Sequence, residues 1–200
     1  MDAQVWEWRV ATGEHPRQEG EQQLIERCRA GDMEAFGTLW QQHRTAVFRS
    51  ILGIVGNPQD AEDLTQDAFL RAYRALDSFR GEAQLRTWLI RIGVHLAIDH
   101  VKRKKAHPEV SLDWDVGGGY ADIDPHAAAE RNELRETVRK AIDALPPHHR
   151  AVIVLRDMEG MDYSEMAQAL GCSVGSVKLR LFRARRLLKQ RLEVLLGGSP

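Results

Sequence analysis

Between Ser173 and Arg191 the chain carries seven basic residues and no acidic one, with the apolar Leu179 and Phe182 among them. If this segment is a helix, the face opposite its apolar side carries Ser176, Lys178, Leu179, Arg180, Phe182, Arg183 and Arg186. Lysine and arginine suit the phosphates and base edges of DNA, and apolar side chains suit the methyl group of thymine. A Leu and a Phe exposed among arginines are a liability unless a partner covers them. The pattern therefore predicts a helix that reads duplex DNA.

The residues before this segment predict the first helix of a helix-turn-helix. Asp162 and Glu165 have the spacing of a capping box at its start. Gly171 suits the left-handed position that ends a helix, and Ser173 suits the cap of the next one. So short a turn makes the two helices cross steeply, as in the DNA-binding motif, although a helical hairpin without a ligand is the alternative. The positions expected to hold the second helix in place are Val174, Val177, Leu181, Leu188, Leu192 and Leu195.

A second basic segment has a different design. A long helix is expected over residues 85–105, where six basic residues accompany one acid. One face of it carries, at three- and four-residue spacing, Arg91, His95, Asp99 and Lys102. Trp88 lies near its start, beside the polar residues 80–86. An aromatic ring there is suited to stack on an unpaired base, and the neighbouring loop to hold a flipped base, whereas packing of Trp88 in the core is the alternative.

Helical periodicity continues through most of the chain, and no segment shows a convincing strand pattern. Asp32 and Asn57-Pro58 predict helix starts, and residues 79–84 predict a loop. Prolines, glycines and acidic residues within residues 106–128 predict a flexible acidic linker. We therefore expect an all-α protein of two small helical domains joined by that linker, divided into a poorly ordered N-terminal extension (1–21), a first domain (22–105), the linker (106–128) and a helix-turn-helix domain (129–196).

The composition argues against an enzyme and against a membrane protein. With 200 residues, 43% of them hydrophobic and 28% charged, and a formal net charge of −1, the chain is expected to be globular. It has no run of about 18 apolar residues and no signal-peptide pattern, which predicts a cytoplasmic protein without membrane insertion. Cys28, Cys172 and the pair His148-His149 lack the spacing of a metal site or a disulfide framework. Residues 117–119 do not form a phosphate-binding loop. No cofactor and no metal is expected.

Several segments in both halves have sequences typical of one family. In the first half these are residues 60–73 (DAEDLTQDAFLRAY), 79–81 (FRG), 87–92 (TWLIRI) and 97–104 (AIDHVKRK). In the second half they are residues 144–147 (ALPP), 155–167 (LRDMEGMDYSEMA) and 175–185 (GSVKLRLFRAR). The chain thereby closely resembles the extracytoplasmic-function (ECF) sigma factors of the sigma-70 family. The resemblance covers roughly residues 22–195, with independent motifs in the right order.

The resemblance implies a dissociable, non-enzymatic subunit of bacterial RNA polymerase. It implies docking on the β′ clamp helices of core polymerase through Asp60, Asp63, Leu64, Gln66, Asp67, Leu70 and Arg71. It implies recognition and melting of the promoter −10 element through Phe79, Arg80, Trp88, Arg91, His95, Asp99, Lys102 and Arg103. The exposed face of residues 176–186 would then read the −35 element, while other surfaces of that domain meet the β flap. Core polymerase and promoter DNA are the expected partners, and an anti-sigma factor is the expected regulator.

Three positions depart from the pattern frequent in the family. His95 stands where Asn is frequent, Leu179 replaces a small polar residue, and Val174 replaces an acid. The promoter sequence therefore does not follow from relatives. Two other functions stay open at this point. A stand-alone helix-turn-helix regulator explains residues 162–191 but leaves the first domain without a role, and an anti-sigma-like adaptor or phosphorelay protein has no use for the basic faces.

Overall fold

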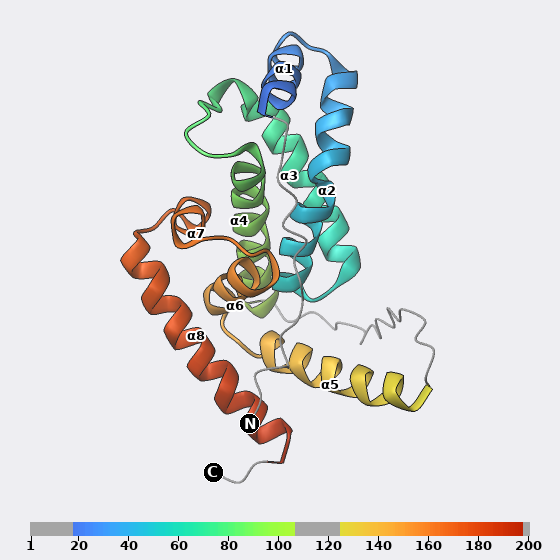
Figure 1. The fold of residues 1–200 in the computed structure, drawn as a ribbon, viewed down its shortest axis with the longest axis vertical. Coiled ribbons are helices and arrows are strands. Elements are labelled where there is room, and N and C mark those ends of the chain that lie inside the picture. Colours follow the sequence, from blue (N-terminus) through green and yellow to red (C-terminus); the bar gives the residue numbers. More distant parts are fainter. Residues whose placement is uncertain (1–17, 107–124, 198–200) are drawn as a thin grey trace.

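The computed structural model describes residues 18–106 and 125–197, and every regular element within them is helical (Figure 1). The elements are α1 (Gln18–Arg29), α2 (Met33–Val55), α3 (Pro58–Ala75), the 3-10 turn η1 (Leu76–Ser78), α4 (Leu85–Ala106), α5 (Pro125–Asp143), α6 (Pro147–Ile153), the π-helical turn η2 (Val154–Met158), α7 (Tyr163–Leu170) and α8 (Val174–Leu195). The prediction of an all-α protein is confirmed for these residues. Trp6 and Trp8, and most of the predicted linker, lie outside them.

Helix starts in the first half follow from local caps, as the sequence predicted. The Asp32 carboxylate accepts two backbone N–H groups in the first turn of α2, at 2.9 and 3.1 Å. The Asn57 side chain caps α3 in the same way, and Pro58 is the first residue of that helix. Gly56, with φ of 77°, makes the turn between the two helices. Helix α1 begins at Gln18, inside the range predicted as an extension.

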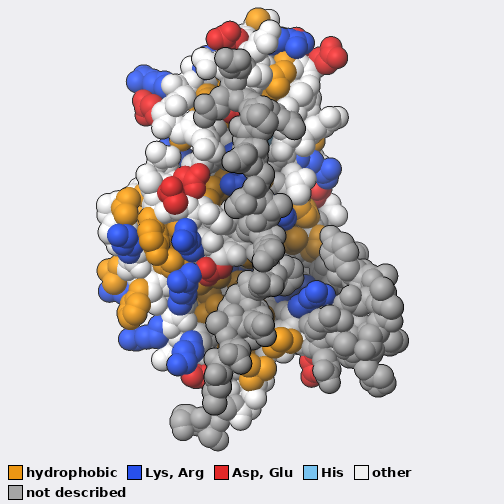
Figure 2. Space-filling view, in the orientation of Figure 1, with side chains coloured by type: hydrophobic (Ala, Val, Ile, Leu, Met, Phe, Trp, Pro, Cys, Tyr) orange, Lys and Arg blue, Asp and Glu red, His pale blue; other side chains and the backbone are white. Residues whose placement is uncertain are grey.

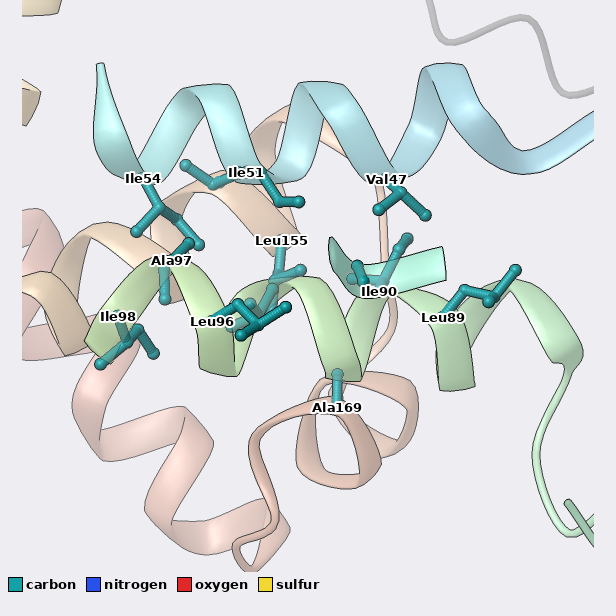
Figure 3. Close-up of a cluster of buried hydrophobic side chains, with 14 of the residues drawn as sticks. Val47, Ile51, Ile54, Leu89, Ile90, Leu96, Ala97, Ile98, Leu155 and Ala169 are labelled. Carbon is teal, nitrogen blue, oxygen red and sulfur yellow. The ribbon is translucent and has the colours of Figure 1, made fainter. Parts of the chain in front are cut away.

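The core of the first half lies between α2, α3 and α4, which contact one another along their lengths. Val47 and Ile51 of α2 face Ile90 of α4 and are completely buried (Figure 3). Gly93 lets the two helices approach closely, because a Cβ atom there would lie only 3.0 Å from Ile51 Cδ1. Helix α1 packs against α2 at one end of this group. The first half thus presents two helices, α3 and α4, with one exposed face each.

The second half contains the predicted helix-turn-helix, formed by α7 and α8. The capping box is complete, because Asp162 accepts the Glu165 N–H at 2.8 Å and Glu165 accepts the Asp162 N–H at 2.8 Å. Gly171 ends α7 in the left-handed conformation with φ of 61°. The Ser173 hydroxyl then caps α8. These four residues confirm the predicted helix ends of the helix-turn-helix.

Two residues of α8 do not pack as expected. Val174 and Leu195 are 39% and 48% exposed, whereas Val177 and Leu181 are buried. Val174 is the first residue of the helix, ahead of the turn that meets α7, and Leu195 lies where α8 extends past its shorter neighbours (Figure 1). The fully buried residues of α8 lie in its first half, and the helix is not buried along its whole length.

The two halves pack against each other around a shared core. Helix α7 contacts α4. Helix α6 contacts both α2 and α4, and η2 contacts α2. Leu155 of η2 lies between Ile51 and helix α4, and Ala169 of α7 faces α4 (Figure 3). Residues 151–155 are all buried, in a core cluster that contains residues of both halves. The two predicted domains are recognisable, but they are docked together.

Two negative findings apply to the part of the chain that the structure describes. No helix in it is both long and apolar enough to span a membrane. Its His, Cys, Asp and Glu side chains form no cluster of three that could hold a metal ion. Cys28 is buried and Cys172 is partly buried, and both are free thiols.

Candidate nucleic-acid interface

Helix α8 presents a face of cationic and apolar side chains to solvent. Leu179 is 50% exposed and Phe182 is 67% exposed, on the side opposite the buried Val177 and Leu181. Ser176, Lys178, Arg183 and Arg186 are also exposed, and Arg180 is partly exposed. Figure 2 shows hydrophobic side chains lying among Lys and Arg at the lower left, over α7 and α8. Leu179 and Phe182 are therefore accessible from solvent, as recognition of DNA by this face requires.

Two cations of α8 contact their own half of the protein. The Lys178 ammonium lies over the Tyr163 ring, 5.4 Å from its centroid, and Arg185 pairs with Asp157 at 2.5 Å. Both Lys178 and Arg185 are exposed, so each contact contributes little to stability. Arg183, one turn along from Leu179, points to the face that carries Phe182. The geometry suits a helix whose arginines meet phosphates or base edges of a major groove.

The exposed face of α4 carries the second set of cations. Arg91, His95, Asp99, Lys102 and Arg103 are all exposed on one helix. The His95 ring donates from Nδ1 to the Arg91 carbonyl at 2.8 Å, which fixes the ring along the helix. Asp99 lies 4.0 Å from Lys102, so part of that charge is balanced locally. The face is polar and solvated, with the cations concentrated at the C-terminal end of α4.

The cations of α4 and α8 converge near two histidines. The pKa of His148 is lowered, first by partial burial and then by the charges of Lys102 on α4 and Arg180 on α8. The pKa of His149 is lowered by burial and then by Arg180 and Arg183. The pKa of His148 is thus lowered by cations of both halves. Lys102 of α4 and Arg180 of α8, which are far apart in the sequence, therefore both lie near His148.

A pocket of about 360 Å³ opens beside the start of α4. It is lined by Ser78, Phe79, Arg80, Glu82, Ala83, Trp88, Arg91 and Gln168. Phe79 is 8% exposed and its ring centre lies 5.1 Å from that of Trp88, so Phe79 is a core residue that supports the partly buried Trp88. Arg80 and Arg91 bring cations to the rim. An aromatic wall beside cations suits an unstacked base of a nucleic acid strand.

Arg29 of α1 holds the segment 76–79, whose last residues line this pocket, in place. Its guanidinium donates to the Phe79 carbonyl at 2.5 Å and to the Leu76 carbonyl at 3.3 and 3.4 Å. The contact spans 47 to 50 residues of sequence. The planar fork of an arginine suits two carbonyl groups at once. Sequence reasoning missed this residue, because nothing in its local pattern indicates so distant a partner.

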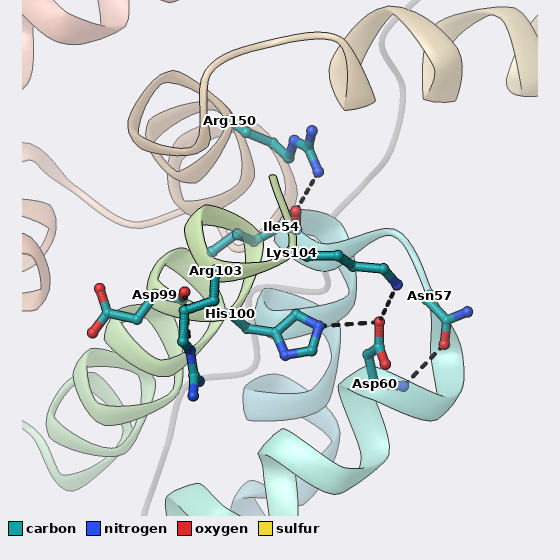
Figure 4. A network of polar contacts seen from close by, with 8 residues as sticks. All are labelled: Ile54, Asn57, Asp60, Asp99, His100, Arg103, Lys104 and Arg150. Atoms are coloured by element: carbon teal, nitrogen blue, oxygen red, sulfur yellow. Dashed lines mark hydrogen bonds and ion pairs between the residues drawn. The ribbon is translucent and has the colours of Figure 1, made fainter. Parts of the chain in front are cut away.

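The acidic helix α3 exposes one edge. Asp63, Gln66, Asp67 and Arg71 are exposed, and Leu70 is 53% exposed among them. Leu64 is 8% exposed and belongs to the core, so it supports this edge from beneath. Asp60 contacts α4, since its Oδ2 lies 3.2 Å from both Lys104 Nζ and His100 Nε2 (Figure 4). Leu64 and Asp60, which were predicted to belong to the contact surface of α3, therefore do not belong to its exposed edge.

Comparison with known proteins assigns the two halves. Residues 39–107 match the family Sigma-70 region 2, and residues 135–188 match Sigma-70, region 4. The chain is 37% identical over 187 residues to RNA polymerase sigma-H factor of Pseudomonas aeruginosa, covering 90% of this chain and 97% of the relative. This chain belongs to the ECF sigma factors of the sigma-70 family. It is accordingly a non-enzymatic transcription initiation factor.

Further relatives agree with the assignment of both regions. The ECF RNA polymerase sigma-E factor of Escherichia coli is 36% identical over 186 residues, covering 88% of this chain and 96% of the relative. The solved structure of CnrH in complex with the cytosolic domain of CnrY is 28% identical, with a TM-score of 0.64, covering 91% of this chain and all of that chain. RpoE of Bartonella quintana, solved with the anti-sigma factor NepR, shares the fold at a TM-score of 0.59 and 24% identity, covering 82% of this chain and 98% of that one.

The regions of this sigma factor meet at polar contacts that sequence reasoning did not find. Glu159, just after η2 in region 4, lies 2.5 Å from Arg86 of α4 and 3.4 Å from Arg49 of α2. Burial raises the pKa of Glu159, and the two arginines oppose that shift only in part. Arg150 of α6 donates to the Ile54 carbonyl at the end of α2 (Figure 4). Region 4 is thus attached to region 2 by its own buried charges.

Proposed function

We propose that this sigma factor brings core RNA polymerase to promoters by reading the −35 element with α8 and by capturing and melting the −10 element at the pocket beside α4. The observation that carries the proposal is the exposure of Leu179 and Phe182 among arginines on the second helix of the helix-turn-helix. An exposed apolar pair of this kind needs a partner surface, and a major groove with thymine methyl groups provides one.

Reading of the −35 element rests on residues of one helix face, namely Ser176, Lys178, Leu179, Arg180, Phe182, Arg183 and Arg186. Ser176 lies in the first turn of α8, near the end that enters a groove in helix-turn-helix proteins. Arginine makes paired hydrogen bonds with guanine, and cations that meet phosphates fix the register. The other side of α8 is held by the buried Val177, Leu181 and Ala184, which keeps the reading face rigid.

Melting of the −10 element needs a site that stabilises an unstacked base, because unstacking costs a few kcal/mol per step. Trp88 offers its ring as one wall of the pocket, and Arg80 and Arg91 offer cations for the adjacent phosphates. His95, Asp99, Lys102 and Arg103 continue along α4 in the direction in which a separated strand would lie. Phe79 contributes from beneath by supporting Trp88.

Core polymerase binding rests on the exposed edge of α3, where Leu70 stands among Asp63, Gln66, Asp67 and Arg71. We assign this edge to the β′ clamp helices and an outer surface of region 4 to the β flap. The solved relatives CnrH and RpoE are complexes with CnrY and with the anti-sigma factor NepR. An anti-sigma factor is therefore proposed as the regulator of this chain as well, and the cytoplasm as its location.

Run-off transcription with core polymerase tests the proposal. We expect core polymerase with this chain to start at discrete promoters mapped on genomic fragments, and the chain alone to bind the same DNA weakly. Core polymerase alone is the control for non-specific starts. If the chain adds no specific start on any template while it still co-purifies with core polymerase, the proposed promoter function is wrong.

A further inference from the structure

We propose that His95 selects one base of the −10 element by accepting a hydrogen bond from the amino group of an adenine or a cytosine. This inference rests on the function proposed above and names what one position of the α4 face recognises. Lys102 and Arg103, on the same face, are donors that suit any phosphate and so fix position more than sequence. His95 differs from them in the ring nitrogen that it leaves without a proton.

The tautomer of the His95 ring is fixed by its own helix. The Nδ1 atom lies 2.8 Å from the carbonyl oxygen of Arg91, one turn earlier in α4. A carbonyl oxygen only accepts hydrogen bonds, so the proton of this contact belongs to Nδ1. A neutral imidazole has a single N–H group. Nε2 of the neutral ring is therefore a hydrogen-bond acceptor.

Nε2 is available to a ligand. The His95 side chain is exposed, and within residues 18–106 and 125–197 no group forms a hydrogen bond or ion pair with Nε2. Asp99, one turn further along α4, is itself an acceptor, and its carboxylate lies 4.0 Å from the Lys102 ammonium. The exposed face of α4 thus carries an acceptor without a donor, between cations.

An acceptor at this position does not suit the backbone of DNA. Phosphate oxygens accept hydrogen bonds and donate none, so they meet Lys102 or Arg103 but not an unprotonated Nε2. DNA also lacks the 2′-hydroxyl group, which gives the backbone of RNA a donor. The donors of DNA lie on its bases. If the α4 face contacts DNA, Nε2 therefore meets the edge of a base.

The type of base follows from the donors that bases expose. On the major-groove edge, adenine presents the N6 amino group and cytosine the N4 amino group. One hydrogen of each amino group is free even within a base pair, so the contact can form before and after the strands separate. Guanine and thymine present only acceptors on that edge. They would place an acceptor against Nε2, and His95 therefore favours adenine or cytosine.

The selected base is not the base held in the pocket. His95 lies seven residues after Trp88, or about 10 Å along the axis of α4. Neighbouring bases of a strand are about 3.4 Å apart. A base that contacts His95 is therefore separated from a base that stacks on Trp88. The two residues act at different positions of the −10 element.

An asparagine at position 95 would select less strictly. Its side-chain amide both donates and accepts hydrogen bonds, so it can pair with adenine and can also donate to the acceptors of guanine or thymine. The fixed tautomer of His95 removes the second possibility. His95→Asn is accordingly the variant that tests the tautomer argument, and His95→Ala removes the acceptor altogether. Both changes are at an exposed position.

A long-range proton–nitrogen NMR correlation spectrum of the full chain, with isotope-labelled histidine, tests the tautomer directly. The measurement is made at about pH 8, where an imidazole is neutral. The His95 signals are those that disappear in H95N. We expect a proton on Nδ1 and none on Nε2. A proton on Nε2 would overturn the inference, because the ring would then present a donor.

Binding of modified DNA tests the selection. Holoenzyme assembled from core polymerase and this chain is titrated, by fluorescence anisotropy, with a fork-junction −10 probe from a mapped promoter. Each adenine is replaced in turn by purine and each cytosine by pyrimidin-2-one, which lack only the amino group. We expect one position at which this loss weakens binding about five- to tenfold, the value of one base contact. Guanine or thymine at that position should weaken binding at least as much.

The variants assign this effect to His95. In H95A, loss of the amino group at the sensitive position should make no difference to binding. H95N should bind probes with guanine or thymine at that position more tightly than wild type does. Lys102→Ala is the contrast on the same face, because loss of a phosphate contact weakens all probes to a similar degree and keeps the amino-group effect. Equal melting temperatures of H95A and wild type check that the fold is kept.

The outcomes separate this inference from the proposed function. If wild-type holoenzyme binds the probe, but wild type and H95A respond equally to every amino-group deletion, the inference is wrong and the proposed function stands. The same conclusion follows if H95N discriminates against guanine and thymine as strongly as wild type. If the chain with core polymerase binds the probe no better than core polymerase alone, the proposed function fails and this inference falls with it.

Discussion

The Glu159 carboxylate lies 2.5 Å from the Arg86 guanidinium, across 73 residues of sequence. Arg86 lies in the first turn of α4, two residues before Trp88, so a residue of region 4 is attached to the element that forms the base pocket. Arg49 of α2 lies on the other carboxylate oxygen at 3.4 Å. Burial nevertheless raises the pKa of Glu159 more than these two cations lower it. The contact therefore fixes the orientation of region 4 more than it stabilises the docked state.

This shift predicts a pH dependence of the free energy of unfolding. The folded state, with the raised pKa, binds a proton at Glu159 more tightly than the unfolded chain, in which Glu159 is in solvent. The contribution of this group is fully present below the ordinary glutamate pKa and is lost as pH rises through the raised value. Glu159→Gln, which is neutral at every pH, should remove this contribution. We expect E159Q to be at least as stable as wild type at neutral pH.

Thermal unfolding of wild type and E159Q between about pH 5 and 8 measures the difference. The difference between the two proteins isolates Glu159, because Arg49 and Arg86, which face it, are present in both proteins. His148, His149 and Asp143 titrate in both proteins and cancel in the difference. A stability loss of E159Q that is constant over the whole range would contradict the prediction.

Arg183→Ala should impair recognition of the −35 duplex. Arg183 is exposed on the face that carries Phe182, and loss of a side chain that meets a base costs about 1–3 kcal/mol, or roughly tenfold to a hundredfold in affinity. Arg185→Ala is the matched control, because Arg185 pairs with Asp157 of its own region. Anisotropy with the duplex and co-purification with core polymerase are the measurements. Equal loss of both activities in R183A would identify a structural residue instead.

Trp88→Ala should slow promoter opening. Its ring forms a wall of the pocket, and stacking of a base on an aromatic ring is worth about 1–3 kcal/mol. Permanganate footprinting of the −10 region measures opening, and a template with a pre-melted −10 bubble should partly restore it. Trp88→Phe keeps an aromatic face beside Phe79 and should retain most of the opening. Absence of rescue by the bubble would favour a purely structural tryptophan.

Arg29→Ala should disturb the loop that begins the pocket. Its guanidinium bonds to two carbonyl groups, and hydrogen bonds from a charged donor contribute about 1.5–3 kcal/mol. We expect a lower melting temperature together with slower opening that a bubble template restores. Arg27→Ala is the control on the same helix, since Arg27 pairs locally with Asp32 at 2.7 Å. If R29A loses stability but opens promoters normally, Arg29 supports the fold alone.

The sequence by itself determined the all-helical class and the starts of several helices. Asp32, Asn57 and Asp162 cap helices through hydrogen bonds to residues two or three positions away, and such contacts are set by neighbouring residues alone. It also determined that Leu179 and Phe182 face solvent, because the helical period separates them from the buried Val177 and Leu181. The family followed from the same local motifs.

The tertiary structure alone decided which side chains remain available. Phe79 and Leu64 belong to the core, although their types and positions suit a contact surface equally well. Exposure of such a residue depends on which helix covers it, and that helix lies far away in sequence. Arg29 and Phe79 meet for the same reason, across 50 residues.

Docking of region 4 on region 2 was likewise decided only in three dimensions. It depends on the fit between Gly53 and Val154 and on the position of Glu159 between Arg49 and Arg86. No periodicity or cap indicates these pairs, because the sequence sets local hydrogen bonds and amphipathic faces but not which two faces meet. The shape and charge of the assembled surfaces make that selection, and they exist only after the helices have formed.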